Sequence, residues 1–148
     1  QESCFSNSVL HDLANVHFIG KISEDDIGRY VRSFDVCINP QAVNELTKGY
    51  AYLLTHPGIP MIWGYHYFFT DTTGSLRKDI DEFILIRKEM GINATSSVRV
   101  IEAINGSSGY YVAEIDSKLL IKIGDAPYIP SGTWIELKSG SGYSIWSK

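Results

Sequence analysis

The 148-residue sequence has only two cysteines, Cys4 and Cys37. Two thiols far apart in the chain are too few for a disulfide framework and do not have the paired spacing of a zinc site. We therefore expect two free thiols, with Cys37 in a buried strand. His11 and His17 have no partners at metal-ligand spacing, so the sequence predicts neither a metal site nor a cofactor.

Positive charge is also scarce, with 13 Lys and Arg against 17 Asp and Glu. A net charge of −4 argues against a nucleic acid or an anionic membrane as partner, because either would require a basic face. No apolar run reaches the roughly 18 residues of a membrane span, and we find no signal-peptide pattern. The chain starts at Gln1 rather than Met, which leaves its compartment open. Glycine-rich phosphate loops are absent from the sequence as well.

Apolar residues make up 44% of the chain, enough for one domain or a domain with a small appendage. The first half alternates between strand and helix patterns. Residues 16–19 and 35–38 are strand-like, and the helix between them starts at Ser23 and buries one face. Such a strand–helix–strand unit is right-handed, with parallel strands.

A second helix over residues 43–55 and a third strand over 59–63 continue this pattern. Residues 64–74 are predicted to be a loop at the carboxyl end of that strand, where α/β folds usually place chemistry. The segment 75–90 is an amphipathic helix ended by Gly91, and its Asp79, Asp81 and Glu82 are expected on the solvated side.

After Gly91 the apolar period changes from about 3.6 to 2. The five strand-like segments are residues 98–104, 110–115, 119–123, 133–137 and 143–146. Short connections favour antiparallel neighbours in a meander that packs one apolar face on the helix before it. The predicted fold class is α/β: a partial parallel layer of three βα units followed by a small antiparallel β-sheet.

Five sequence words point to a known family: GYAYLLTHPGIPMIW, IRKEMGI, NATSS, YYVAEIDSKLLIKIG and GYSIW. In this order they resemble the C-terminal part of plant-type α-amylases. The resemblance implies that residues 51–91 form the last βα unit of a (β/α)8 barrel and that residues 92–148 form the β-sheet domain after it. The activity it implies for the parent family is hydrolysis of starch or other α-1,4-glucans.

Residues 1–50 resemble a different family. The run NVHFIGKISEDDIGRYVRSFDVCINPQAVNELTKGY is similar to the second domain of two-domain, nucleotide-sugar-dependent glycosyltransferases. Taken together, the two resemblances indicate a chimera joined at Gly49 and Tyr50. Whether such a join is natural or engineered stays open at this stage.

Neither resemblance supplies catalytic residues. Retaining glycosidases need two carboxylates about 5 Å apart, and the amylase family places its carboxylates on barrel strands before the GYAYLL word. Here Asn39, Pro40 and Gln41 stand where an Asn-His-Asp word would be expected. The glycosyltransferase donor residues lie mostly beyond Gly49, where the sequence has become amylase-like. We therefore expect no catalytic residue in this chain.

Sugar binding without catalysis is the remaining option. Plant amylases of this type can carry a surface sugar site on the sheet domain, and Lys122 and Trp146 match it by motif. Trp134 and Tyr143 add aromatic rings of the kind that stack on sugars. The segment 125–130 departs from the family pattern, with Tyr128 out of register. The alternative is that these aromatics are ordinary core and surface residues of a sheet.

Three functional hypotheses follow: a non-catalytic structural region of an α-amylase, a weak binding module for α-glucan or maltooligosaccharide, and a glycosyltransferase-derived domain. An incomplete barrel would leave a sheet edge open and favour self-association. His56, before Pro57 and Gly58, is expected to bond to backbone at a helix end, and His66 is the better ligand candidate. Two N-glycosylation triplets start at Asn93 and Asn105.

Overall fold

A computed structural model describes residues 17–19, 45–69, 73–106 and 109–148. The expected helix after Ser23, the strand at 35–38 and both cysteines lie outside these residues. No helix in the described part of the chain is long and apolar enough to span a membrane.

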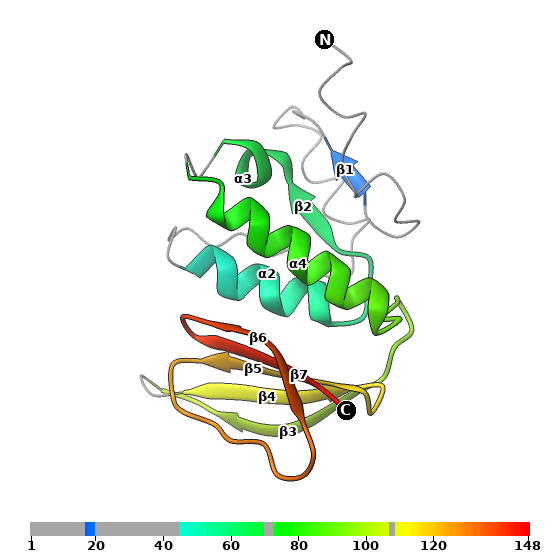
Figure 1. Ribbon diagram of the computed structural model, residues 1–148, viewed down its shortest axis with the longest axis vertical. Helices are drawn as coiled ribbons and strands as arrows, with labels where there is room; N and C mark the ends of the chain where they lie inside the picture. Colours follow the sequence, from blue (N-terminus) through cyan, green and yellow to red (C-terminus); the bar gives the residue numbers. More distant parts are fainter. Residues whose placement is uncertain (1–16, 20–44, 70–72, 107–108) are drawn as a thin grey trace.

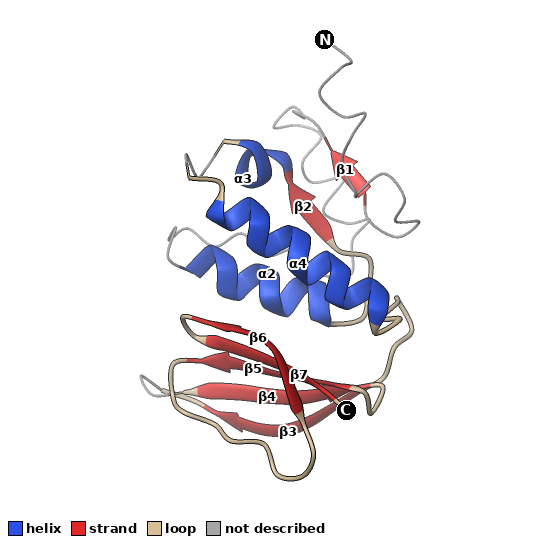
Figure 2. Cartoon of the chain, in the orientation of Figure 1, coloured by secondary structure: helices blue, strands red, loops and turns tan. Residues whose placement is uncertain are grey.

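The chain builds a helical layer on top of a sheet (Figure 1). The first part contains β1 (His17–Ile19), α2 (Leu46–Thr55), β2 (Met61–Trp63), α3 (Gly64–Phe68) and α4 (Ser75–Glu89). The second part contains only strands, coloured red in Figure 2: β3 (Val98–Ile104), β4 (Tyr110–Ile115), β5 (Leu119–Gly124), β6 (Ile135–Gly140) and β7 (Tyr143–Ser147).

β1 and β2 pair in parallel, with His17 opposite Met61 and Ile19 opposite Trp63. This pairing agrees with the expected direction of the first and third strands. The described residues show no parallel layer of three βα units, and the expected helix after Ser23 and strand at 35–38 lie outside them. What the structure shows is a few helices followed by a five-stranded antiparallel sheet.

The segment 64–74 was expected to be a loop, and this was wrong for its first part. Residues Gly64 to Phe68 form the short helix α3, which ends as the Phe69 N–H donates to the carbonyl oxygen of Tyr65 at 2.9 Å. No glycine or proline interrupts the run from Tyr65 to Phe69, so nothing in it opposes a helical turn.

α4 forms where its periodicity predicts. Leu76, Ile80, Phe83 and Ile84 recur on one side and are buried, and Gly91 ends the helix in a left-handed conformation with φ +67°. The acidic side of α4 is not simply solvated. Asp79 and Glu82 bind the ammonium group of Lys138 on β6, with Asp79 Oδ1 at 2.8 Å from Lys138 Nζ.

Asp81 also has a partner, because the Tyr67 hydroxyl donates to its Oδ1 at 2.7 Å. Our expectation of a solvated acidic face was therefore wrong. These acidic residues connect α4 to β6 and to α3. β6 is distant in the sequence, and α3 lies in a segment without a periodic apolar pattern, so the sequence did not predict either contact.

The sheet is antiparallel but is not the simple meander that we expected. Its strand order is β3-β4-β5-β7-β6, so β7 rather than β6 pairs with β5. The tight turn between β6 and β7 makes these two strands a hairpin, and the long loop from residue 125 to 134 carries the chain past the place that β7 fills. β3 and β6 are the two edge strands.

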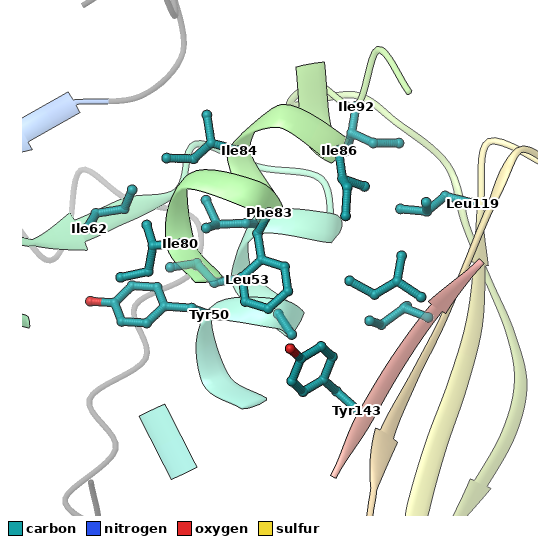
Figure 3. Close-up of a cluster of buried hydrophobic side chains, with 14 of the residues drawn as sticks. Tyr50, Leu53, Ile62, Ile80, Phe83, Ile84, Ile86, Ile92, Leu119 and Tyr143 are labelled. Carbon is teal, nitrogen blue, oxygen red and sulfur yellow. The ribbon is translucent and has the colours of Figure 1, made fainter. Parts of the chain in front are cut away.

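The core lies between the helices and the sheet. α2 and α4 cover one face of the sheet, and Figure 3 shows side chains of both layers meeting. Phe83 of α4 packs edge-on against Tyr143 of β7, with ring centroids 5.3 Å apart. The labelled members of this cluster are Tyr50, Leu53, Ile62, Ile80, Phe83, Ile84, Ile86, Ile92, Leu119 and Tyr143.

A buried arginine closes the C-terminal end of α2. Arg87 is 2% exposed, and its guanidinium donates to the carbonyl oxygens of Leu54, His56 and Gly58 at 3.1, 2.6 and 2.8 Å. These carbonyls lie in the last turn of α2 and just after it, where no intrahelical donor remains for them. Arg87 therefore ties α4 to the Pro-Gly turn, a role that its placement on the apolar side of α4 did not reveal.

His56 lies in the same turn, as the sequence predicted. Its Nδ1 is 2.9 Å from the carbonyl oxygen of Tyr52, its Nε2 is 2.9 Å from the hydroxyl of Tyr111 on β4, and its ring stacks on Tyr52. Burial first, and then the charge of Arg87, lowers the pKa of His56 to about 4 against the opposing effect of the bond to Tyr52. His56 is thus a neutral link between the helices and the sheet.

Candidate functional site

The two faces of the sheet differ in chemistry. We call the side that contacts α2 and α4 the near face and the opposite side the far face. Because side chains alternate along a strand and directly paired residues share a face, the register assigns each position. Val112 pairs with Lys122, and Leu120 pairs with Trp146, so these four residues lie on the far face.

Aromatic rings gather at the centre of the far face. Trp146 is 6% exposed and forms a small cluster with Val112 and Leu120. Tyr128, from the loop before β6, lies over Trp146 in an edge-on arrangement with centroids 6.2 Å apart, and Tyr110 is 6.1 Å from Tyr128. Tyr110, Tyr128 and Trp134 are half-buried, so they expose ring surface while Trp146 supports them from below.

Lys122 lies beside this cluster at the end of β5. It is 6% exposed, and its ammonium group donates to the carbonyl oxygen of Gly124. Burial lowers the pKa of Lys122, with Asp125 opposing the shift and Lys48 adding to it.

A second charged group borders the rings. Glu114 is buried on the far face and pairs with Arg99 and with Lys148, whose Nζ is 2.8 Å from Glu114 Oε1. Hydrogen bonds from Lys148 and then Arg99 hold the pKa of Glu114 below its usual range. Lys148 also lies over the Trp134 ring, 4.5 Å from its centroid, which fixes the edge of the aromatic surface.

The structure thus places three of the four residues predicted to bind sugar on the far face: Lys122, Trp146 and Trp134. The fourth, Tyr143, lies on the near face against Phe83 and is 3% exposed. Its position follows from strand alternation, since Tyr143 is three residues from Trp146 and must point to the other side. Tyr143 is a core residue in this fold.

Tyr128 is part of the far-face cluster although the sequence did not place it there. It is out of register with the family motif, yet the loop brings its ring onto Trp146. The available signal was a tyrosine between two prolines, Pro127 and Pro130, in the one long connection of the sheet region. Prolines restrict such a loop and favour a fixed path across the face.

His66 has a local role in α3. The Tyr50 hydroxyl is 2.9 Å from His66 Nδ1, and burial lowers the pKa of His66. In the described ranges, no three His, Cys, Asp or Glu side chains converge as a metal would require.

Comparisons with known proteins agree with this architecture. Residues 89–147 match the family model of the alpha-amylase C-terminal beta-sheet domain. The chain is 32% identical over 112 residues to the alpha-amylase type B isozyme of Hordeum vulgare, covering 74% of this chain and 69% of that protein. The chain therefore belongs to the α-amylase family, and β3 to β7 form its C-terminal β-sheet domain.

Two Arabidopsis thaliana proteins are also similar. Probable alpha-amylase 2 is 37% identical over 110 residues, which cover 74% of this chain but 25% of that protein. Chloroplastic alpha-amylase 3 is 30% identical over 102 residues, covering 67% of this chain and 11% of that protein. The chain therefore spans only a quarter or less of the length of these two relatives.

The comparisons give no support to a glycosyltransferase origin for residues 1–50. All three relatives are named as α-amylases, and most of this segment lies outside the described residues. The chimera remains a prediction from sequence, and no part of the site depends on it.

Proposed function

We propose that this chain is the C-terminal region of an enzyme that hydrolyses α-1,4-glucan, and that the chain itself is structural rather than catalytic. The observation that carries the proposal is the interface between α2, α4 and the near face of the sheet. It joins the helices α2 and α4 to the family's sheet domain through one continuous core. A sheet attached this way stabilises the end of a larger α/β enzyme.

The engagement of the carboxylates supports a non-catalytic role. Glycoside hydrolysis by retention needs two carboxylates about 5 Å apart, one as nucleophile and one as acid. In the described residues, Asp79 and Glu82 share Lys138, and Glu114 is neutralised by two cations. Because Lys148 and Arg99 hold the pKa of Glu114 low, this carboxylate is a poor proton donor.

The test is release of reducing sugar from soluble starch by the purified chain. We expect no release above that of the heat-denatured chain, provided that the sample shows a cooperative unfolding transition. Release by the parent chain would overturn the assignment of a structural role. Loss of that release in the double variant Asp79→Asn, Glu82→Gln would place catalysis at these two carboxylates, and its persistence would place catalysis elsewhere in the chain.

A second candidate function is weak binding of α-glucan on the far face. The half-buried rings of Tyr110, Tyr128 and Trp134 support it, because aromatic rings stack on the apolar faces of sugars. Trp146 supports these rings, and Lys122 lies within the same surface region as a hydrogen-bond donor. In this proposal, Trp146 and Lys122 act mainly by positioning.

Calorimetric titration with maltoheptaose tests the second function. We expect saturable binding that Trp134→Ala and Tyr128→Ala each weaken at least tenfold, the equivalent of about 1.4 kcal/mol or more. Tyr143→Phe is the matched control, since it keeps a ring in the core and should leave affinity unchanged. Equal affinity in all four proteins would exclude the far face as the binding site.

A further inference from the structure

The triplet Asn93-Ala94-Thr95 lies in the exposed connection between α4 and β3. The backbone N–H and the hydroxyl of Thr95 both donate to Asn93 Oδ1 at 2.9 Å. The Asn93 amide Nδ2 donates to the carbonyl oxygen of Gly91 at 3.2 Å. All three residues are exposed, and their bonds involve only immediate neighbours.

A second triplet of the sequence, Asn105-Gly106-Ser107, begins directly after the same strand, and its Ser107 lies outside the described residues. Asn105 is exposed and comes directly after Ile104, the last residue of β3. Asn93 precedes the strand and Asn105 follows it. The two asparagines therefore flank β3 along the chain.

β3 is the strand of the sheet that most needs protection. It is an edge strand, and it exposes four apolar side chains: Val98, Val100, Ile101 and Ile104, which are 40–54% exposed. The free backbone groups of an edge strand can pair with another chain, and apolar side chains on that strand favour the association. A bulge between Val100 and Glu102 interrupts the edge only in part.

We propose that Asn93 and Asn105 are acceptors for N-linked glycosylation when the chain enters the secretory pathway, and that the glycans shield β3 from pairing with a second copy. The donor is an oligosaccharide carried on a lipid pyrophosphate. The amide nitrogen Nδ2 of asparagine bonds to the anomeric carbon of the sugar, and the bond from that carbon to the phosphate oxygen breaks. The nitrogen loses one proton, and the lipid pyrophosphate leaves.

The fold accommodates this modification at Asn93. Replacing one proton on Nδ2 disturbs the bond to Gly91 at most and leaves both bonds to Oδ1 in place. Water competes for such a surface bond, so its net contribution is small and an attached glycan costs the fold little. A bulky polar glycan at either end of β3 would oppose the close approach that strand pairing requires.

The experiment uses the full chain, secreted from eukaryotic cells behind a cleavable signal peptide, with an Asn-Gly-Thr reporter added after Lys148. Intact mass is measured before and after treatment with an endoglycosidase that removes N-linked glycans. We expect three removable glycans in the parent chain, two in Asn93→Gln and in Thr95→Ala, and two in Asn105→Gln. Thr95→Ser keeps the hydroxyl and should retain all three.

A parent chain glycosylated at the reporter but at neither Asn93 nor Asn105 would overturn the proposal. Sedimentation then tests the shielding. We expect the enzymatically deglycosylated chain to associate more strongly than the glycosylated chain, and we expect Val100→Lys, which places a charge on β3, to remove the difference. Equal association of the two forms would show that the glycans do not protect this edge.

Discussion

The two faces of the five-stranded sheet carry different kinds of residues. On the near face, Ile121, Ile145 and Tyr143 are at most 3% exposed and meet Phe83 of α4. On the far face, the half-buried rings of Tyr128 and Trp134 lie above a thin buried layer, and charged groups border them. One face holds the domain to the helices, and we propose that the other binds sugar.

The difference also shows how each face uses charge. The near side uses buried groups as connections: Arg87 to backbone carbonyls, His56 to Tyr111, and Lys138 to the acidic residues of α4. The far side balances Glu114 with cations at its border. Substitutions on the near side should therefore affect stability most, and those on the far side should affect binding most.

The largest effect on stability is expected from Phe83→Ala. Phe83 is fully buried between the helices and β7, so its truncation removes apolar contacts and leaves a cavity. We expect a loss of about 3–5 kcal/mol in the free energy of unfolding, measured by urea denaturation. Phe83→Leu, which fills part of the volume, should lose clearly less. Equal losses would show that this interface is not tightly packed.

The next effect is a dependence of stability on pH. Burial lowers the pKa of His56 from 6.5 to about 4, so the folded state favours the neutral ring. The unfolded chain binds the proton first as pH falls. The stabilisation is complete above pH 6.5, is lost progressively below it, and is gone below about pH 4, a change of about 3 kcal/mol.

Urea denaturation between pH 7 and 4.5 measures this loss. His66, whose pKa burial also lowers, contributes in the same range, so the comparison that isolates His56 is between the parent chain and His56→Gln. We expect the variant to be less stable at pH 7 and less dependent on pH. Parallel pH profiles would contradict the buried, neutral His56.

A smaller effect is expected from Lys138→Met. Burial alone would lower the pKa of Lys138, but hydrogen bonds to Asp79 and Glu82 raise it above its ordinary value. Methionine keeps the stem but leaves the two partly exposed carboxylates unpaired, which should cost about 1 kcal/mol. The loss should be smaller in high salt, because salt screens the attraction between Lys138 and the two carboxylates in the parent chain. A loss that does not respond to salt would indicate a packing role.

The smallest effect on stability is expected from Trp134→Ala on the far face. The half-buried ring packs at the border of the Val112, Leu120 and Trp146 cluster, and Lys148 lies over it, a contact of about 0.5–1 kcal/mol. Thermal unfolding should therefore show a loss of about 1 kcal/mol, well below that of Phe83→Ala. A loss as large as that of Phe83→Ala would mean that the far face is also structural.

The sequence predicted the periodic elements well. The spacing of apolar residues in α4, the stop at Gly91 and the change of period after it correspond to the helix and the five strands of the structure. The quoted family words also located the sheet domain, which the family match places at residues 89–147. Local pattern was sufficient here because each element buries one face.

Non-local features could not be predicted in the same way. The strand order depends on the path of the loop before β6. Pairing each strand with the next one in sequence predicts β6 beside β5, whereas β7 lies there. The spacing of Arg87 puts it on the apolar side of α4 but does not predict what it binds. Its three carbonyl partners lie 29 to 33 positions earlier in the chain. Tyr143 was predicted to bind sugar because it is an aromatic residue of the sheet. The alternation of side chains along a strand already indicated that Tyr143 and Trp146 point to opposite faces.

Amide hydrogen exchange in the presence and absence of maltoheptaose tests the division between the two faces most directly. We predict that α4, β5 and β7 exchange slowest and at a common rate, as one cooperative unit held by the near face. The sugar should slow exchange in the loop that carries Tyr128 and Trp134. Fast exchange in α4 beside a slow sheet would contradict the shared core, and unchanged exchange in that loop at saturating sugar would contradict the role of the far face.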